Sequence, residues 1–247
     1  MIVSHKNRFI FIKGGKVGGT SFEIRLTPHC GDDDVVTPFG VVAEDARDEQ
    51  ARSELSGGRG PQNYLPKIWS YGLQDFRRFF QGKTPRHKYW NHMSAEAIRR
   101  NLNPAIWDSY TKVGIFRDPF DTAVSLYFWS QESERGPVSK FGFQTWLMAN
   151  AHRLNDNWNM ALVNGKMCLD VVIDFENPTL GLSMLVEKTG LPASFLTEEI
   201  PYKAKSGHRP KWATVEHLFS EFPEGIEAVS YHCADQIESL KHSVPGQ

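Results

Sequence analysis

A short apolar run that breaks into a glycine-rich turn constrains this chain more than any other feature. Residues 9–12 are all large and apolar, and four of the seven residues that follow them are glycine. Such a run is typical of a strand buried on both faces, as in the centre of a parallel sheet. Thr20 and Ser21 stand where a helix can begin, so the turn, its Lys16 and the N–H groups of the helix start form a cradle for an anion. The pattern predicts an α/β protein that binds a phosphate-like group at this turn.

The position of the lysine separates this turn from the Walker A loop. A Walker A loop has Lys directly after its last glycine, and then a Ser or Thr that holds Mg²⁺. Gly14 and Gly19 have the Walker spacing, but Thr20 occupies the lysine position and Lys16 lies inside the loop. The pattern therefore argues against an ordinary ATP or GTP site. A glycine-rich turn without a ligand is the other interpretation of the same residues.

A second candidate anion site follows another strand-like run. Residues 110–116 predict a strand, after which Asp118 can cap a helix and Pro119 can take its first position. Arg117 then lies at the carboxyl end of a strand, where ligands bind in open α/β sheets. Ser125 is about two helical turns further on, so its hydroxyl and the forked guanidinium of Arg117 can hold one phosphate together.

The two segments together resemble the nucleotide-binding elements of sulfotransferases that use 3′-phosphoadenosine-5′-phosphosulfate. The order K-x-G-G-T-S after a strand resembles their 5′-phosphosulfate loop, and R-D-P-x-[DE]-x-x-x-S resembles their 3′-phosphate element. A strand that ends in Phe175-Glu176-Asn177 adds a weaker likeness, and Glu176 is expected to be a structural carboxylate. The resemblance covers about residues 7–190 and implies a P-loop-like three-layer sandwich of the carbohydrate or small-molecule sulfotransferase type.

The resemblance also implies which residues bind the nucleotide. The 5′-phosphosulfate would be bound by the loop and the helix start, and the 3′-phosphate by the strand-end arginine and the helix serine. A basic loop late in the chain would close over the nucleotide. In this sequence the residues for the 5′-phosphosulfate are Lys16, Gly18, Gly19, Thr20 and Ser21. Those for the 3′-phosphate are Arg117 and Ser125. Those of the late basic loop are Lys205, Ser206 and Arg209.

The implied reaction moves a sulfuryl group from this donor to a hydroxyl, or an amine, of a small-molecule or carbohydrate acceptor. Transfer is an in-line displacement in which Lys16 neutralises charge on the bridging oxygen, and no metal is expected. His92, at the end of a short predicted strand, is the expected general base, with activity falling below about pH 6–7. His87, Glu96 and an acidic residue of 31–54 are the alternatives for the base.

Two other functions remain open. One is a P-loop small-molecule or nucleoside kinase that uses ATP and Mg²⁺. The other is a nucleotide-binding scaffold whose catalytic base has been lost. Thr20 at the Walker lysine position argues against the kinase, and Arg117 with Ser125 suits a 3′-phosphate that ATP lacks.

The order of predicted elements points to one α/β domain over 1–247. The alternation predicts a doubly wound, mostly parallel sheet flanked by helices. Residues 31–66 lack clear apolar periodicity and predict a flexible insertion near the acceptor site or a solvated surface loop. Strands are predicted at 8–13, 87–91, 110–116 and 169–175, and helices at about 19–29, 94–101, 118–133 and 178–189.

Composition argues against several classes of binding partner. A formal charge of −1 gives no basic field for a nucleic acid, and three scattered cysteines argue against a disulfide framework or a zinc site. No run approaches the ~18 apolar residues of a membrane span. Because the chain shows no membrane anchor of the kind that Golgi sulfotransferases carry, we expect a cytoplasmic enzyme without a membrane partner.

Overall fold

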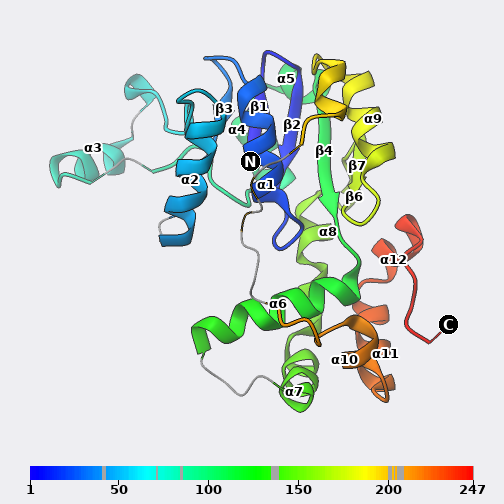
Figure 1. Ribbon diagram of the computed structural model, residues 1–247. Coiled ribbons are helices and arrows are strands. Elements are labelled where there is room, and N and C mark those ends of the chain that lie inside the picture. Colours follow the sequence, from blue (N-terminus) through cyan, green and yellow to red (C-terminus); the bar gives the residue numbers. More distant parts are fainter. Residues whose placement is uncertain are drawn as a thin grey trace.

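A mixed five-stranded sheet forms the centre of one half of the molecule. The computed structural model describes residues 1–40, 43–70, 72–83, 86–134, 139–199, 202, 204 and 209–246. The strand order is β3 (Val35–Val36), β1 (Ile2–Ser4), β2 (Phe9–Ile12), β4 (Thr111–Phe116) and β7 (Val171–Asp174) (Figure 1). The three strands β2, β4 and β7 are parallel, whereas β1 is antiparallel to both of its neighbours. Four of the five strands therefore run in one direction, and the predicted mostly parallel α/β sheet is confirmed.

Helices cover both faces of this sheet, because successive strand side chains alternate between them. Phe9 and Phe11 belong to a buried cluster with α1 (Gly19–Leu26) and α9 (Thr179–Lys188). Ile10 and Ile12 belong to a second cluster with α4 (Ala95–Asn101) and α5 (Pro104–Ser109). The arrangement is compatible with a three-layer sandwich.

A separate helical half carries its own hydrophobic cluster. Figure 1 shows α6, α7, α10 and α11 of this cluster at the end of the molecule away from the sheet, with α12 nearer to the sheet. Aromatic side chains such as Phe120, Phe143 and Phe219 meet edge to face inside it. The cluster draws on α6 (Pro119–Glu134), α7 (Lys140–Asn150), η3 (Ala151–Asn155), α10 (Val215–Phe219), α11 (Pro223–His232) and α12 (Ala234–Leu240).

The remaining elements connect these two halves or lie around the sheet. They are the 3₁₀ turns η1 (Thr27–His29), η2 (Ile68–Ser70) and η4 (Ala193–Leu196), the helices α2 (Ala43–Leu55), α3 (Leu73–Phe80) and α8 (Asp156–Met160), and the hairpin of β5 (Leu162–Val163) and β6 (Lys166–Met167). Within the described ranges, no helix is long and apolar enough to cross a membrane.

Two of the predicted helix starts are confirmed, and each has a side-chain cap. The Asp121 N–H donates to Asp118 Oδ1 over 2.9 Å, with Pro119 at the first helical position of α6. Ser94 caps α4 by accepting from the Ala97 N–H over 3.4 Å. These caps fix where each helix leaves the sheet edge.

Two sequence expectations differ from the structure. The strand predicted at 87–91 is wrong: the Lys88 and Tyr89 N–H groups both donate to the Tyr64 carbonyl, and this piece turns instead of joining the sheet. The sheet gains β1 and β3 instead, two strands too short for a pattern of apolar alternation. The segment 31–66 contains β3 and α2, and Arg52 of α2 is fully buried.

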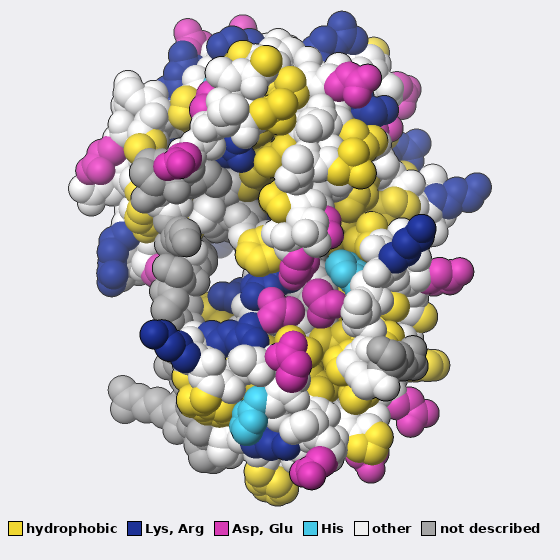
Figure 2. Space-filling view, turned by 45° about the vertical axis from the view of Figure 1, so that its right-hand side comes forward, with side chains coloured by type: hydrophobic (Ala, Val, Ile, Leu, Met, Phe, Trp, Pro, Cys, Tyr) yellow, Lys and Arg dark blue, Asp and Glu magenta, His cyan; other side chains and the backbone are white. Residues whose placement is uncertain are grey.

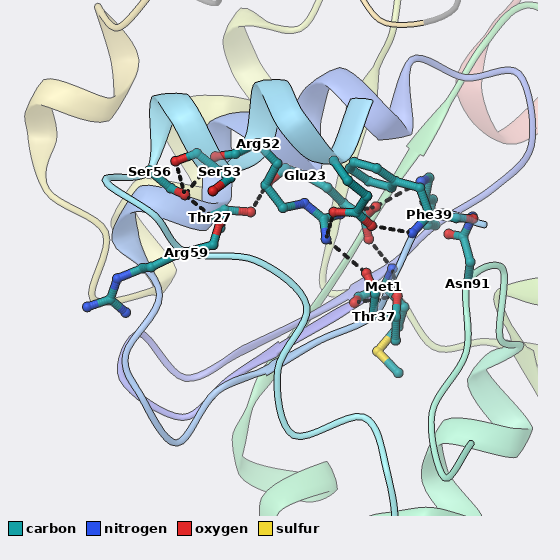
Figure 3. A network of polar contacts seen from close by, with 12 residues as sticks. Met1, Glu23, Thr27, Thr37, Phe39, Arg52, Ser53, Ser56, Arg59 and Asn91 are labelled. Carbon is teal, nitrogen blue, oxygen red and sulfur yellow. Dashed lines mark hydrogen bonds and ion pairs between the residues drawn. The ribbon is translucent and has the colours of Figure 1, made fainter. Parts of the chain in front are cut away.

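A buried carboxylate anchors α1 under the glycine-rich turn. Figure 3 shows Glu23 of α1 and Arg52 of α2 meeting beside Met1. Glu23 Oε2 lies 2.8 Å from Lys13 Nζ and 3.5 Å from Arg52 Nη2, and all three side chains are almost completely buried. Burial alone would raise the pKa of Glu23, but the positive charges of Lys13, the Met1 amine and Arg52 lower it to about 2. The ammonium of Lys13, directly after β2, therefore forms an ion pair that stabilises the fold.

Candidate functional site

A cavity of about 870 Å³ lies where the carboxyl ends of β2 and β4 face the helical half. It brings together all the predicted site residues that the structure describes, while Lys205 and Ser206 lie outside the described residues. Figure 2 shows the molecule hollowed on one face, with Lys and Arg side chains beside a group of Asp and Glu side chains. The predicted residues that line the cavity are Lys16, Gly18, Gly19, Thr20, Ser21, His92, Arg117, Ser125 and Arg209.

The start of α1 is built to leave its N–H groups facing the cavity. Gly18 is the N-cap with a φ of 71°, and no side chain caps the helix or places an acidic group in its first turn. The first N–H groups of a helix have no partner within it, and the helix dipole favours an anion there. A Cβ on Gly18 would lie 2.6 Å from the Phe175 ring, and one on Gly19 would lie 2.8 Å from Lys13 Cγ. Only glycine fits at both positions.

A side chain from α8 holds the loop from the opposite side. The Asn157 Oδ1 accepts from the Gly15 N–H over 2.7 Å, and its Nδ2 donates to the Gly15 carbonyl over 2.9 Å. A Cβ on Gly14 would lie 2.8 Å from the same amide oxygen. Sequence reasoning missed Asn157, since no local pattern marks a partner 142 positions from Gly15.

Lys16 links the loop to the helical half of the molecule. Its φ is 59°, and its Nζ lies 5.4 Å from the centre of the Trp129 ring of α6. Its carbonyl accepts from Arg117 Nη1 over 3.1 Å. The two predicted anion elements are therefore joined directly, one through its backbone and the other through its guanidinium.

Asp121 binds two arginines at the edge of the cavity. Arg117 Nε donates to Asp121 Oδ2 over 2.6 Å, and Arg209 contacts the other oxygen of that carboxylate. Burial would raise the pKa of Asp121, but the charges of Arg117 and Arg209 outweigh it, so its pKa is lowered. Two guanidinium groups with one carboxylate leave a net positive charge, and Ser125 follows on the same helix.

Phe175 and Glu176 support the Arg117 loop from the end of β7. The Arg117 guanidinium lies over the Phe175 ring, 4.7 Å from its centre. The Asp118 N–H donates to both carboxylate oxygens of Glu176, at 3.3 and 3.2 Å. Burial, together with a hydrogen bond to Asp174, raises the pKa of Glu176 to about 7. Glu176 has the structural contacts that the sequence predicted.

His92 reaches the cavity from a strained backbone position, with a φ of 54°. Its Nδ1 lies 3.1 Å from the carbonyl oxygen of Lys13. A carbonyl can only accept, so Nδ1 carries the proton and the neutral ring keeps Nε2 as an acceptor. The ring has surface exposed to the cavity but is recessed among protein atoms, and burial, with the charge of Lys13 second, lowers its pKa to about 4. The expectation of an ordinary histidine pKa near 6–7 is corrected downward.

The alternative bases do not line this cavity. His87 packs edge to face on Tyr64, and Glu96 forms a 3.2 Å ion pair with Arg100 on α4. No acidic residue between 31 and 54 is among the cavity residues that the structure describes, whereas Asp156 of α8 is. Asp156 was not expected from the sequence.

The helical half contributes further residues to the cavity wall. Arg153 of η3 adds a cation, and Trp129 and Trp146 add aromatic rings to the wall. Arg25 of α1 also lines the cavity, with its guanidinium 4.2 Å from the Phe195 ring centre. Each is one polar or aromatic residue in an ordinary helix, with no motif to distinguish it from a surface or core residue.

Comparison of the chain with protein-family models, with curated proteins and with solved structures finds no match. In the part of the chain that the structure describes, no three His, Cys, Asp or Glu side chains form a group that could hold a metal ion. The expectation of a reaction without metal stays a prediction. The functional argument therefore depends on the geometry of the cavity.

Proposed function

We propose that this protein is a sulfotransferase that uses 3′-phosphoadenosine-5′-phosphosulfate as its donor. One observation carries the proposal: the glycine-rich loop, the Arg117–Ser125 element and His92 line the same cavity. These three segments are far apart in the sequence, which predicts that they act on the 5′-phosphosulfate, the 3′-phosphate and the acceptor proton respectively. Their meeting in one place supports one ligand with two anionic ends.

The residues present fit such a donor. The start of α1 offers N–H groups in a site where a Cβ would collide, which suits a phosphate-like group in close contact with the backbone. Arg117, Arg153 and Arg209 give the cavity a positive wall, and only Asp156 among the described lining residues is acidic. The volume of about 870 Å³ leaves room for a nucleotide and a compact acceptor. When bound, the donor would supply the sulfuryl group.

The residues of the chain would divide the chemistry among them. Lys16 would offset negative charge that develops on the phosphate side, and the N–H groups of Thr20 and Ser21 would orient the same group. His92, neutral at pH 7, would accept the proton of the acceptor hydroxyl or amine at Nε2. Trp129 and Trp146 would flank a small-molecule or carbohydrate acceptor.

Isothermal titration calorimetry with adenosine 3′,5′-bisphosphate, adenosine 5′-phosphosulfate and ATP tests the proposal. We expect the bisphosphate to bind, and Arg117→Ala to weaken it about tenfold to a hundredfold, the value of a charge-assisted contact. The same change should leave the affinity for adenosine 5′-phosphosulfate, which lacks the 3′-phosphate, largely unaltered. Arg100→Ala, on the exposed side of α4, is the matched control.

Two outcomes would overturn this assignment. Micromolar binding of ATP without any response to the bisphosphate would favour the kinase alternative. Equal losses for both adenosine ligands in Arg117→Ala would mean that Arg117 supports the fold through Asp121 and does not bind the 3′-phosphate.

A further inference from the structure

The segment 67–80 exposes large apolar side chains at a density found nowhere else among the described residues. Trp69 of η2 is 83% exposed, Leu73 of α3 is 90% exposed and Phe80 is 84% exposed. Leu73, Phe76 and Phe80 are three, four and seven positions apart, so they share one face of α3. Figure 1 shows α3 at one end of the molecule, away from the strands of the sheet. The apolar face of α3 is thus turned to solvent.

The same segment is strongly basic. Residues 67–88 contain six lysines and arginines and a single acidic residue, Asp75, although the whole chain carries a formal charge of −1. Arg77 and Arg78 lie on α3 itself, and Lys67 places its Nζ 5.2 Å from the centre of the Trp69 ring. Positive charge is therefore concentrated beside the exposed apolar face.

We propose that η2 and α3, with the basic side chains beside them, bind the surface of a bilayer that contains anionic lipids. A short amphipathic helix with Trp, Phe and Leu on one face and Arg beside them is suited to the boundary between headgroups and acyl chains. A second copy of this chain fits less well, since pairing would bring two basic segments together. A charged polymer would satisfy the arginines but would leave Trp69, Leu73 and Phe80 in water.

The dimensions of α3 favour a position in the plane of the interface. Its eight residues span about 12 Å, far less than the ~30 Å hydrocarbon core. The sequence expectation of no membrane partner was based on the lack of a spanning segment, and an interfacial helix needs none. The cavity of the candidate functional site is lined by other elements, so this proposal is independent of the proposed function.

Cosedimentation with vesicles tests the proposal, using phosphatidylcholine alone or mixed with phosphatidylserine. We expect binding to the mixed vesicles only, weakened by added salt. The triple variant Trp69→Ser, Leu73→Ser, Phe80→Ser and the double variant Arg77→Glu, Arg78→Glu should each lose about tenfold or more in vesicle affinity. The matched control is Phe141→Ser, Leu180→Ser, Tyr231→Ser, whose side chains are also more than 70% exposed and should leave binding unchanged.

Several results would overturn the proposal. These are no binding to mixed vesicles, equal binding to both vesicle types, or full binding by the triple variant. Binding to heparin that is indifferent to the triple variant, without vesicle binding, would indicate a polyanion partner. A dimer seen by light scattering and lost in the triple variant, again without vesicle binding, would indicate self-association. Circular dichroism of each variant checks that its fold is intact.

Discussion

Lys16 enters the cavity from a left-handed backbone position, at a φ of 59°, which few side-chain-bearing residues adopt. If its ammonium stabilises charge in the transition state, Lys16→Ala should lower kcat by about 10²-fold, the scale for one preorganised donor. Affinity for adenosine 3′,5′-bisphosphate should fall much less. Steady-state kinetics and calorimetry measure the two effects separately.

Lys166→Ala, at an exposed lysine of β6, is the control for a general loss of positive charge. Near-normal turnover of Lys16→Ala would remove this residue from the mechanism.

The recessed site keeps His92 neutral, the form that a general base requires, and the hydrogen bond with the Lys13 carbonyl fixes its proton on Nδ1. Because its pKa is lowered to about 4, the ring stays neutral well below pH 6.5. We expect kcat/KM to hold its value as the pH falls through 6.5 and to decline only as it approaches 4, and His92→Ala to lower kcat by about 10²- to 10⁴-fold. A pH profile over this range is the measurement.

A decline centred near pH 6.5, or full activity in His92→Ala, would assign the base to another group. Asp156 would then be the first to test, since it lines the cavity and the other candidate bases do not.

At the scale of elements, α8 clasps the glycine-rich loop through Asn157. Asn157→Ala removes both hydrogen bonds to Gly15, each worth about 0.5–1.5 kcal/mol. The loop should lose its preorganisation, so bisphosphate affinity should fall about tenfold. The thermal midpoint should fall by about 2–4 °C for each kcal/mol of stability that is lost. Calorimetry and thermal unfolding measure the two quantities.

Asn159→Ala, two positions along the same helix and exposed, is the matched control. Unchanged affinity in Asn157→Ala would show that the loop keeps its conformation without α8.

The contact between α1 and α2 is a buried ion network centred on Glu23. Its pKa in the fold, about 2, is below the ordinary value of 4.5, so its contribution to stability is complete above pH 4.5 and is lost as the pH falls toward 2. Glu23→Gln should destabilise the chain by about 3–5 kcal/mol at pH 7, because it leaves buried cations unpaired. The loss of stability below pH 4.5 should also become shallower.

Urea unfolding at several pH values measures both effects, with Glu54→Gln on the exposed side of α2 as the control. An unchanged pH dependence in Glu23→Gln would mean that other carboxylates control acid unfolding.

Local pattern predicted the elements that have a strong local cause. The strands β2, β4 and β7 are apolar runs, and α4 and α6 begin at side-chain caps that the sequence displays. The strand wrongly predicted at 87–91 has only the adjacent aromatic residues Tyr89 and Trp90 in its favour, and Tyr89 is buried in a cluster with α4 instead of joining the sheet. The pairing of β1 and β3 depends on sheet contacts that two or three residues do not reveal.

The residues of the candidate site also fall into two groups, those that a local sequence pattern predicts and those that only the packing of the chain brings to the cavity. Lys16, Arg117 and Ser125 belong to motifs whose spacing reports a strand end or a helix start, so their position in the cavity could be predicted. Asn157 and Arg153 reach it only because the helical half folds back over the sheet edge. Their place depends on the packing of the whole chain.

At the scale of the whole molecule, the cavity is the meeting place of two separate hydrophobic clusters. Val17, Phe22 and Ile115 line it from the sheet half, while Phe128 and Leu154 line it from the helical half. A ligand in the cavity would contact both halves at once.

This division has a consequence for how the chain opens and closes. Two cores that meet across a cavity are expected to behave as two cooperative units that open at different free energies. Native-state hydrogen exchange should resolve them in the free protein. Adenosine 3′,5′-bisphosphate at about 100 times its Kd should add about 2.7 kcal/mol to openings that break its site.

A single exchange isotherm for both units without ligand would contradict this picture. If the two isotherms merge on binding, the nucleotide couples the two units so that they open together. The rate of hydrogen exchange in the helical unit then reports whether the donor is bound.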